Sequence, residues 1–347
     1  MKKTLVALFA FALVGAACTS DAATSTTPTP SPLTTTAGLE SESGPKPVIV
    51  DYSPTVSDVG GLMYLLSHPD VEVIAISLPA AGEAGCDLGV EVTNGILAMF
   101  DREEIPVACD PTFPDNYNEW PEEFLRGHEN LLSTLPASAV APYEGTGSEL
   151  IIEMVLAADR PVTIYAVGPL TNVARALAAS SDIADNLERI VIMGGAVDVA
   201  GNTFDGYAEW NIFIDPASAD AVIASDVPIT LVPLDATNYV PVPDGYANNL
   251  ERATQSDQII YLGDLVSQFP AVTSGFYYFW DELAAAVVTG DVDIETVTVD
   301  LRVIVGGSED GRTAREPTGK TVTVATGVVS PEDFYEEFIT RLAGDQR

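Results

Sequence analysis

Strands and helices alternate along most of this sequence, and that alternation constrains the fold more than any other feature. Segments rich in valine and isoleucine are predicted to be strands, at residues 47–51, 71–78, 105–110, 161–168, 189–195 and 227–235. Between them lie segments with apolar residues at helical spacing, such as LTNVARALAAS and PASADAVIAS. Continuously apolar strands are typical of strands buried on both faces. We therefore predict an α/β fold with a mostly parallel central sheet and helices on both faces.

An acidic turn directly follows the first predicted strand, in the stretch PVIVDYSPTVSD at residues 47–58. In open parallel sheets, ligands bind at the carboxyl ends of the strands, near the point where the strand order reverses. Asp51 lies at such an end. The turn fits a site for a cation or a sugar, and it equally fits an ordinary helix cap. This stretch alone leaves both interpretations open.

The N-terminal region has the pattern of a secretory signal. Lys2 and Lys3 precede the apolar run LVALFAFALVG, and Cys18 follows small residues, as in the lipobox of bacterial lipoproteins. We therefore expect lipidation at Cys18 and an extracytoplasmic protein anchored to the cell membrane, the alternative being a soluble secreted protein. Three regions are predicted: a signal peptide at 1–18, a disordered tether rich in Ser, Thr and Pro at 19–45, and a folded domain at 46–347.

Charge and motif content exclude several classes of function. The chain has 51 Asp and Glu against 15 Lys and Arg, which argues against nucleic acid as a partner and disfavours binding to anionic membrane surfaces. Most of this surplus is expected to be a property of the surface rather than of a site. Neither a GxxxxGK[ST] loop nor a GxGxxG turn after the first strand is present, so nucleotide-cofactor chemistry has no support.

Histidines and cysteines are few. His68 precedes a proline at the end of a predicted helix, a position that suits it without any function. His128 lies in a polar stretch and is either a substrate contact or a surface residue. No GxSxG elbow accompanies them, which disfavours hydrolysis by acyl transfer. Cys86 and Cys109 are too few for a structural zinc site, and the sequence leaves open whether they form a disulfide.

Four segments resemble one family, in the right order. PVIVDYSPTVSDVGGLMYLLSHPDVEVIAIS resembles the opening of the inosine/uridine-preferring nucleoside hydrolases, whose first strand ends in an Asp-x-Asp-Pro-Gly-x-Asp-Asp motif. VTIYAVGPLTNVARAL, RIVIMGGAVDVAGN and AEWNIFIDPASADAVI are similar to three later segments of the family. The resemblance implies a nucleoside-hydrolase-like fold with a Rossmann-like core. It also implies hydrolysis of the N-glycosidic bond of a ribonucleoside.

The resemblance assigns roles to residues that match the family's motifs. It implies a calcium ion that holds the ribose hydroxyls and the attacking water, with the carboxylates of Asp58 and Asp281 and the backbone carbonyl of Val167 as ligands. Such oxygen ligands are those that calcium prefers. Asp51 matches the first aspartate of the motif. The residues matched to the ribose contacts are Asn202, Glu209 and Asn211.

This sequence departs from the family pattern at the centre of the mechanism. Ser53 stands where the family has its general base, and Ser57 where it has an aspartate that contacts the ribose. Trp280 matches the histidine that protonates the leaving group, so only stacking on the substrate is expected there. Glu83 matches an asparagine and is either a substitute base or a solvated acid in a glycine turn. An unperturbed serine hydroxyl cannot take a proton from water near pH 7.

Three functions are compatible with these observations. The first is an N-glycosidase for ribonucleosides, either impaired by the serine at its base position or active with another base. The second is an extracytoplasmic lipoprotein that binds a nucleoside or ribose without efficient turnover. The third, a scaffold with only the fold, is disfavoured because a scaffold has no physical need for Asp58, Asn202, Glu209, Asn211 and Asp281. The sequence leaves base preference, calcium occupancy and homo-oligomer formation open.

Overall fold

The computed structural model describes residues 44–132, 135, 140–253, 256–269, 272 and 275–344. The predicted signal peptide, the lipidation at Cys18 and most of the predicted tether lie outside these residues. Within the described part, no helix is long and apolar enough to cross a membrane.

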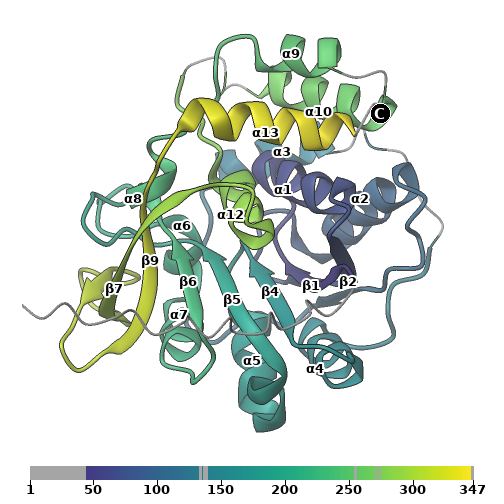
Figure 1. The fold of residues 1–347 in the computed structure, drawn as a ribbon. Helices are drawn as coiled ribbons and strands as arrows, with labels where there is room; N and C mark the ends of the chain where they lie inside the picture. The colour runs from purple at the N-terminus through teal and green to yellow at the C-terminus, as the bar shows by residue number, and fades with distance from the viewer. Residues whose placement is uncertain are drawn as a thin grey trace, which may run out of the picture. The chain divides into compact units, whose positions relative to one another are not determined.

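Nine strands of the described chain form a single sheet (Figure 1). Their order across the sheet is β3-β2-β1-β4-β5-β6-β9-β7-β8, and all neighbours from β3 to β9 are parallel. At the other edge, β7 pairs antiparallel with both β9 and β8. The predicted α/β fold with a mostly parallel sheet is therefore confirmed. The strands are β1 (Lys46–Asp51), β2 (Val71–Pro79), β3 (Val107–Asp110), β4 (Val162–Ala166), β5 (Leu187–Met193), β6 (Ile229–Val232), β7 (Ile294–Val303), β8 (Thr313–Arg315) and β9 (Lys320–Val328).

Helices cover both faces of the sheet, because successive strand residues point to opposite faces and are apolar on each. In β1, Val48 and Val50 pack into one hydrophobic core, whereas Ile49 packs into the other. The first core includes residues of α1 (Val56–Ser67), α2 (Gly85–Met99), α9 (Tyr246–Ala253), α10 (Asp257–Gln268), α12 (Trp280–Thr289) and α13 (Pro331–Ala343). The second includes residues of α4 (Gly147–Ala157), α5 (Thr171–Ala179) and α7 (Pro216–Ile223). The shorter or peripheral helices are α3 (Glu122–Leu132), η1 (Ser181–Asn186), α6 (Trp210–Ile214) and α8 (Leu234–Thr237).

Of the predicted strands, the one at residues 227–235 differs most from the structure. Residues 227–235 were predicted as a single strand, but β6 ends at Val232 and α8 begins at Leu234. Pro233 separates them, since proline has no N–H to donate to a neighbouring strand and is tolerated before the first turn of a helix. The chain thereby turns at the carboxyl end of β6, at the same sheet edge as the acidic turn after β1.

His68 has the structural role expected of it. It ends α1, where its backbone N–H donates to the carbonyl of Leu65 at 3.2 Å. Its imidazole is buried and lies 2.9 Å from the carboxylate of Asp291, which also accepts a hydrogen bond from the Tyr64 hydroxyl at 2.6 Å. These contacts connect α1 to the segment that follows α12. His68 is thus part of the packing between helices.

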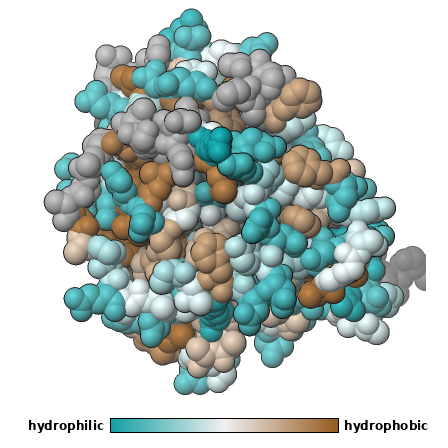
Figure 2. Space-filling view, turned by 180° about the vertical axis from the view of Figure 1, so that it is seen from behind, coloured by the Kyte–Doolittle hydropathy of each residue, from teal (hydrophilic) through white to brown (hydrophobic). Residues whose placement is uncertain are grey.

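The outer surface of the molecule is mixed in character. Figure 2 shows hydrophobic residues in scattered patches between hydrophilic ones on the face opposite to that of Figure 1. The most exposed large apolar side chains of the described residues are Phe204 at 80% and Phe276 at 74%.

Candidate functional site

A cavity of about 660 Å³ lies at the carboxyl ends of the parallel strands. Its position follows from the strand order: β1 lies between β2 and β4, so the loops after these strands diverge and leave space between them. Of the residues predicted for the site, ten line this cavity: Ser53, Ser57, Asp58, Glu83, Val167, Asn202, Glu209, Asn211, Trp280 and Asp281. Gly127 also lines it. The side chain of the neighbouring His128 lies outside the described part of the structure.

The turn after β1 is both a helix cap and part of the cavity wall. Thr55 is the N-cap of α1, and its hydroxyl accepts the N–H of Asp58. The carboxylate of Asp58 in return accepts the N–H groups of Ser53 and Thr55, each at 3.2 Å, and the Thr55 hydroxyl. Burial raises the pKa of Asp58 well above its ordinary value, and these hydrogen bonds oppose the rise. The helix-cap interpretation is therefore confirmed, and the interpretation as a cation or sugar site stays a prediction.

Ser53, at the position of the family's base, is held closely by neighbouring loops. It is 3% exposed and lines the cavity. Gly82, in the loop after β2, approaches it so closely that an added Cβ would lie 2.5 Å from the Cβ of Ser53. Glycine is needed at position 82 for this approach. Gly168, in the segment after β4, approaches from the other side, where an added Cβ would lie 3.1 Å from the backbone nitrogen of Ser53.

A buried acid that sequence reasoning missed lies behind Ser57. The Ser57 hydroxyl donates to Oε2 of Glu282 at 2.7 Å and accepts the N–H of Asp281 at 3.0 Å. Glu282 is 1% exposed, and burial followed by the charge of Asp281 raises its pKa well above the ordinary value. Gly60 of α1 leaves room for it, since an added Cβ would lie 2.5 Å from Oε1. The signal in the sequence was an acid on the apolar helix segment WDELAAAVV.

Glu209 and Asn211 connect the ends of several elements. The Glu209 carboxylate caps α6 and accepts the N–H groups of Gly195, Asn211 and Ile212 at 3.0, 3.0 and 3.3 Å. Burial raises the pKa of Glu209 to about 7, although these hydrogen bonds oppose the rise. The Asn211 amide donates to the backbone carbonyls of Val167 at 3.3 Å and Met193 at 3.2 Å. It therefore links the segments that follow β4 with the end of β5.

Asn202 and the loop that carries Glu83 complete the polar wall. The amide oxygen of Asn202 accepts the N–H of Trp210 at 3.2 Å. Glu83 is only 8% exposed, so the interpretation of a solvated acid is wrong: the loop after β2 folds inward over the cavity. Two further contacts fix this loop. The indole of Trp120 donates to the carbonyl of Ala81 at 2.7 Å, and Cys86 forms a disulfide with Cys109 of β3.

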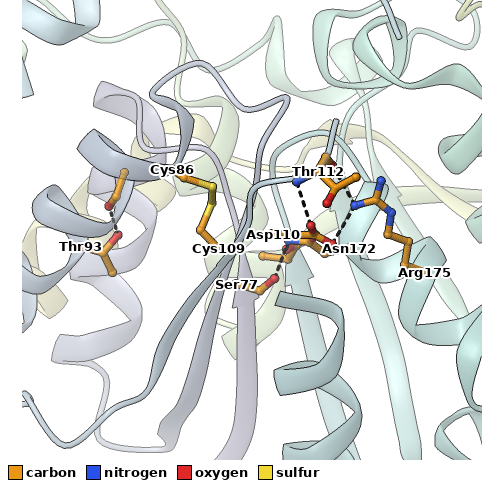
Figure 3. Close-up of a disulfide and its surroundings, with 10 residues drawn as sticks. Ser77, Cys86, Thr93, Cys109, Asp110, Thr112, Asn172 and Arg175 are labelled. Atoms are coloured by element: carbon orange, nitrogen blue, oxygen red, sulfur yellow. Dashed lines mark hydrogen bonds and ion pairs between the residues drawn. A yellow bond between two sulfur atoms is a disulfide. The ribbon is translucent and has the colours of Figure 1, made fainter. Parts of the chain in front are cut away.

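The disulfide settles a question that the sequence left open (Figure 3). Next to Cys109, the carboxylate of Asp110 accepts hydrogen bonds from Arg175 of α5 at 2.7 Å and from the N–H of Thr112 at 2.9 Å. Figure 3 shows these contacts beside the disulfide, with Asn172 donating to Ser77. The end of β3 is thereby connected to α2 on one side and to α5 on the other.

Asp51 is a buried acid whose ionisation opposes folding. Its Oδ1 accepts a hydrogen bond from Asn172 at 3.3 Å, and its Oδ2 is buried without a partner. Burial raises the pKa of Asp51 to about 7, above its ordinary value of 3.8. The raised pKa means that the folded state holds this proton more tightly than the unfolded state does. The resulting stability is present in full below about pH 4 and is lost as the pH rises through about 7.

We therefore expect Asp51→Asn to flatten the pH dependence of stability. The difference in unfolding free energy between wild type and variant should change by up to about 4 kcal/mol between pH 4 and pH 8. Urea denaturation at several pH values in the presence of a chelator measures this. Asp70→Asn, at an exposed position in the turn between α1 and β2, is the matched control. Equal pH slopes for Asp51→Asn and wild type would contradict the assignment.

Asp58 and Asp281 face the same space and repel each other. Asp281 is 5% exposed, and its Oδ1 is buried without a hydrogen-bond partner. Burial raises its pKa well above the ordinary value, and the negative charge of Asp58 raises it further. A cation between two such carboxylates would remove this repulsion.

The residues fit a calcium ion only with a small ligand set. The unpartnered oxygen of Asp281, its proximity to Asp58 and the carbonyl of Val167 suit a hard cation. However, the Ser57 hydroxyl is bonded to Glu282, and the Asp58 carboxylate accepts three hydrogen bonds from its own turn. Among the described side chains, no three His, Cys, Asp or Glu are grouped to hold a metal ion.

Aromatic side chains form the rest of the cavity wall. Trp120 and Trp210 stack with ring centroids 5.6 Å apart, and Phe124 packs edge-on against Trp210. On another part of the wall, Trp280 packs against Tyr277 at 4.9 Å and against Tyr278 at 5.8 Å. All six side chains line the cavity. The site thus combines a polar group of acids and amides with an extended aromatic surface.

A family model described as "Inosine-uridine preferring nucleoside hydrolase" matches residues 48–336. The chain belongs to this nucleoside hydrolase family. Its members hydrolyse the N-glycosidic bond of ribonucleosides.

Relatives of this family member include curated proteins and solved structures. It is 35% identical over 200 residues to the pyrimidine-specific ribonucleoside hydrolase RihA of Shewanella sp. (strain MR-7), covering 57% of this chain and 62% of that protein. It is 33% identical over 207 residues to RihA of Salmonella schwarzengrund, covering 59% and 65%. The chain therefore spans less than two thirds of these curated relatives. The crystal structure of an inosine-uridine preferring nucleoside hydrolase from Bacillus anthracis matches with a TM-score of 0.77 and 28% identity, covering 86% of this chain and 99% of that one.

Proposed function

We propose that this protein hydrolyses the N-glycosidic bond of ribonucleosides in the cavity described above. The observation that carries the proposal is the convergence of Glu209, Asn211, Asp58 and Asp281 on one cavity at the carboxyl ends of the strands. The alternative function, nucleoside or ribose binding without efficient turnover, is favoured by one observation: Ser53 and Ser57 are hydroxyls where the family has carboxylates. The two functions differ in whether base is released.

Two groups of residues in the cavity wall have different roles in the proposed reaction. Asn202, Glu209 and Asn211 would bind the ribose hydroxyls, which orients the anomeric carbon toward the turn after β1. As the bond to the base breaks, positive charge develops on the sugar, and the carboxylates of Asp58 and Asp281 stabilise it. The oxygen of a water molecule bonds to the anomeric carbon, and the water loses a proton. With serine at position 53, Glu83 is the buried carboxylate that we assign to accept that proton.

An assay of base release tests this proposal. We expect the purified protein to release free base from uridine or cytidine, and these pyrimidine ribonucleosides come first because of the RihA relatives. Purine ribonucleosides are the second set. Asp281→Asn should abolish release, whereas Glu91→Gln, at an exposed position of α2, should not change it. Nucleoside binding by calorimetry without release from any nucleoside would support the binding function instead.

We further propose that Asp58, Asp281 and the Val167 carbonyl hold calcium weakly. Bound there, the ion would supply positive charge for orienting the ribose hydroxyls and lowering the pKa of water. The weakness follows from ligand charge, because two carboxylates remain where the family motif provides more.

Ser53→Asp is expected to tighten calcium binding measurably, since it adds a formal negative charge beside Asp58. Isothermal titration calorimetry with calcium alone, in the absence of nucleoside, provides the measurement. Ser308→Asp adds the same charge at an exposed position and is the control. An unchanged or weaker affinity in Ser53→Asp would remove Ser53 from the neighbourhood of the ion.

Localisation is a separate proposal. We propose that lipid on Cys18 anchors the domain outside the cytoplasm. Cys18→Ser should release the protein from the membrane fraction or block its processing, whereas Ser25→Ala in the tether should leave fractionation unchanged. Membrane attachment of Cys18→Ser equal to that of wild type would refute the lipidation.

A further inference from the structure

We propose that the cavity selects N-ribosides whose leaving group carries a positive charge, such as an N-ribosylpyridinium, over neutral nucleosides. The inference rests on the proposed hydrolysis at this site. It extends that proposal by naming the substrate class that suits this particular wall.

The first observation is the charge of the wall. The cavity is lined by five carboxyl side chains and, among the side chains that the structure describes there, by no Lys, Arg or His: Asp58, Glu83, Glu123, Glu209 and Asp281. In addition, Oδ1 of the buried Asp281 has no hydrogen-bond partner. A calcium ion held by Asp58 and Asp281 would leave three further carboxyl groups in the wall. A cationic ligand is therefore favoured and a phosphorylated one is repelled.

The second observation is the aromatic surface. Trp280 lies directly before Asp281 and packs against Tyr277 and Tyr278. Trp120 and Trp210 supply a second pair of rings. Aromatic faces attract a cation through the ring quadrupole, and a planar cation also stacks on them. A planar, positively charged ring matches both the charge and the shape of this surface.

The third observation concerns the leaving group. A neutral base departs more readily when a proton is delivered to it, but the position before Asp281 holds an indole, which is not an acid near pH 7. A cationic ring needs no proton. As water oxygen bonds to the anomeric carbon, the electron pair of the breaking C–N bond returns to the ring nitrogen, which becomes neutral. The proton lost by water goes to a carboxylate of the wall, so the reaction is balanced without an acid for the leaving group.

A binding experiment tests the selection of cations separately from catalysis. N-methylnicotinamide is a cation and nicotinamide is its neutral counterpart, and neither contains a bond that the enzyme would break. We expect calorimetry to show the cation binding at least about 10-fold more tightly. Glu83→Gln and Trp280→Leu should each reduce that ratio, whereas Glu91→Gln should preserve it. Equal affinity for the two compounds would overturn the inference.

A turnover experiment tests the leaving-group step. Guanosine and 7-methylguanosine differ by one methyl group and one positive charge, and nicotinamide riboside provides a pyridinium. We expect kcat/KM, relative to each compound's uncatalysed rate, to be greater for the two cations than for guanosine. Trp280→His should raise guanosine turnover and narrow the ratio, since it returns a proton donor.

The outcomes separate the two proposals. Release of base from neutral nucleosides at a rate equal to that from the cations supports hydrolysis and overturns charge selection. No release from any compound overturns hydrolysis, and the N-methylnicotinamide measurement still decides whether the cavity selects cations. Loss of guanosine turnover in His128→Ala would identify a histidine that protonates the leaving group and would also overturn the inference.

Discussion

Ser53→Asp is expected to raise kcat for ribonucleosides by about 10²–10⁴-fold, the range that a positioned general base contributes. Ser53 is buried in the cavity wall at the end of β1, and Gly82 fixes the backbone around it. A carboxylate there would lie beside Asp58 and could accept the proton of the attacking water. Steady-state kinetics with uridine and cytidine measure the effect.

Ser53→Asn is the matched control, because asparagine has the shape of aspartate without its basicity. An equal increase in kcat with Ser53→Asn would show that size rather than basicity limits the wild type. Rapid wild-type turnover that is abolished by Glu83→Gln would show that Glu83, assigned above to accept the proton, is already a fully effective base. In that case Ser53→Asp should increase kcat only slightly.

Position 57, which the resemblance matches to another aspartate of the family, cannot simply be changed to an acid. The Ser57 hydroxyl donates to the buried carboxylate of Glu282, so an aspartate at 57 would place two buried carboxylates against each other. We expect Ser53→Asp/Ser57→Asp to be less stable than Ser53→Asp alone. Adding Glu282→Gln should recover the lost stability, because the amide can donate to the new aspartate. Thermal denaturation of the three variants makes the comparison.

Glu209→Ala is expected to impair both stability and ligand binding. The substitution leaves the buried N–H groups of Gly195, Asn211 and Ile212 without their acceptor. At about 1–3 kcal/mol for each of the three unsatisfied groups, the unfolding free energy should fall by roughly 3–9 kcal/mol. Urea denaturation gives this value, and calorimetry with a ribonucleoside should show binding weakened by at least about 10²-fold at a temperature where the variant is folded.

Glu209→Gln keeps one acceptor oxygen and should fall between the alanine variant and wild type. Glu91→Ala, on the exposed surface of α2, should change stability by no more than about 0.5 kcal/mol. Ribonucleoside binding that is unaffected in Glu209→Ala would show that the cavity is not the ribose site.

The fold class could be predicted because it depends on local patterns: continuous apolar strands predicted the parallel sheet. The family resemblance supplied ten residues of the cavity wall, among them Ser53, Glu83 and Val167, which follow β1, β2 and β4 at one edge of the sheet. Glu282 was missed because its importance comes from a contact with Ser57, 225 residues away in the chain. The burial of Glu83 was also misjudged, since its glycine-rich surroundings are typical of exposed turns and only the packing of Trp120 and the disulfide turns the loop inward.

The end of β6 at Val232 shows a second limit of prediction from the sequence. The apolar run VPITLVPLD has no break in hydrophobicity, so periodicity alone extends the strand through it. Proline at 233 carries the necessary signal, but prolines also occur at the margins of strands. Only the tertiary path of the chain, which must turn toward the cavity, decides between the two.

The disulfide between Cys86 and Cys109 makes the cavity sensitive to the thiol reagents used in a purification, because it holds the loop that carries Glu83. It closes a loop with a sequence separation of 23 residues, which a chain-entropy estimate values at about 3 kcal/mol, and Glu83 lies three residues before it. Dithiothreitol or growth in a reducing cytosol would free the Glu83 loop from β3 while leaving the sheet intact. Preparations that differ only in their exposure to thiols would then present different cavities to the same nucleoside, and activities measured on them would not be comparable.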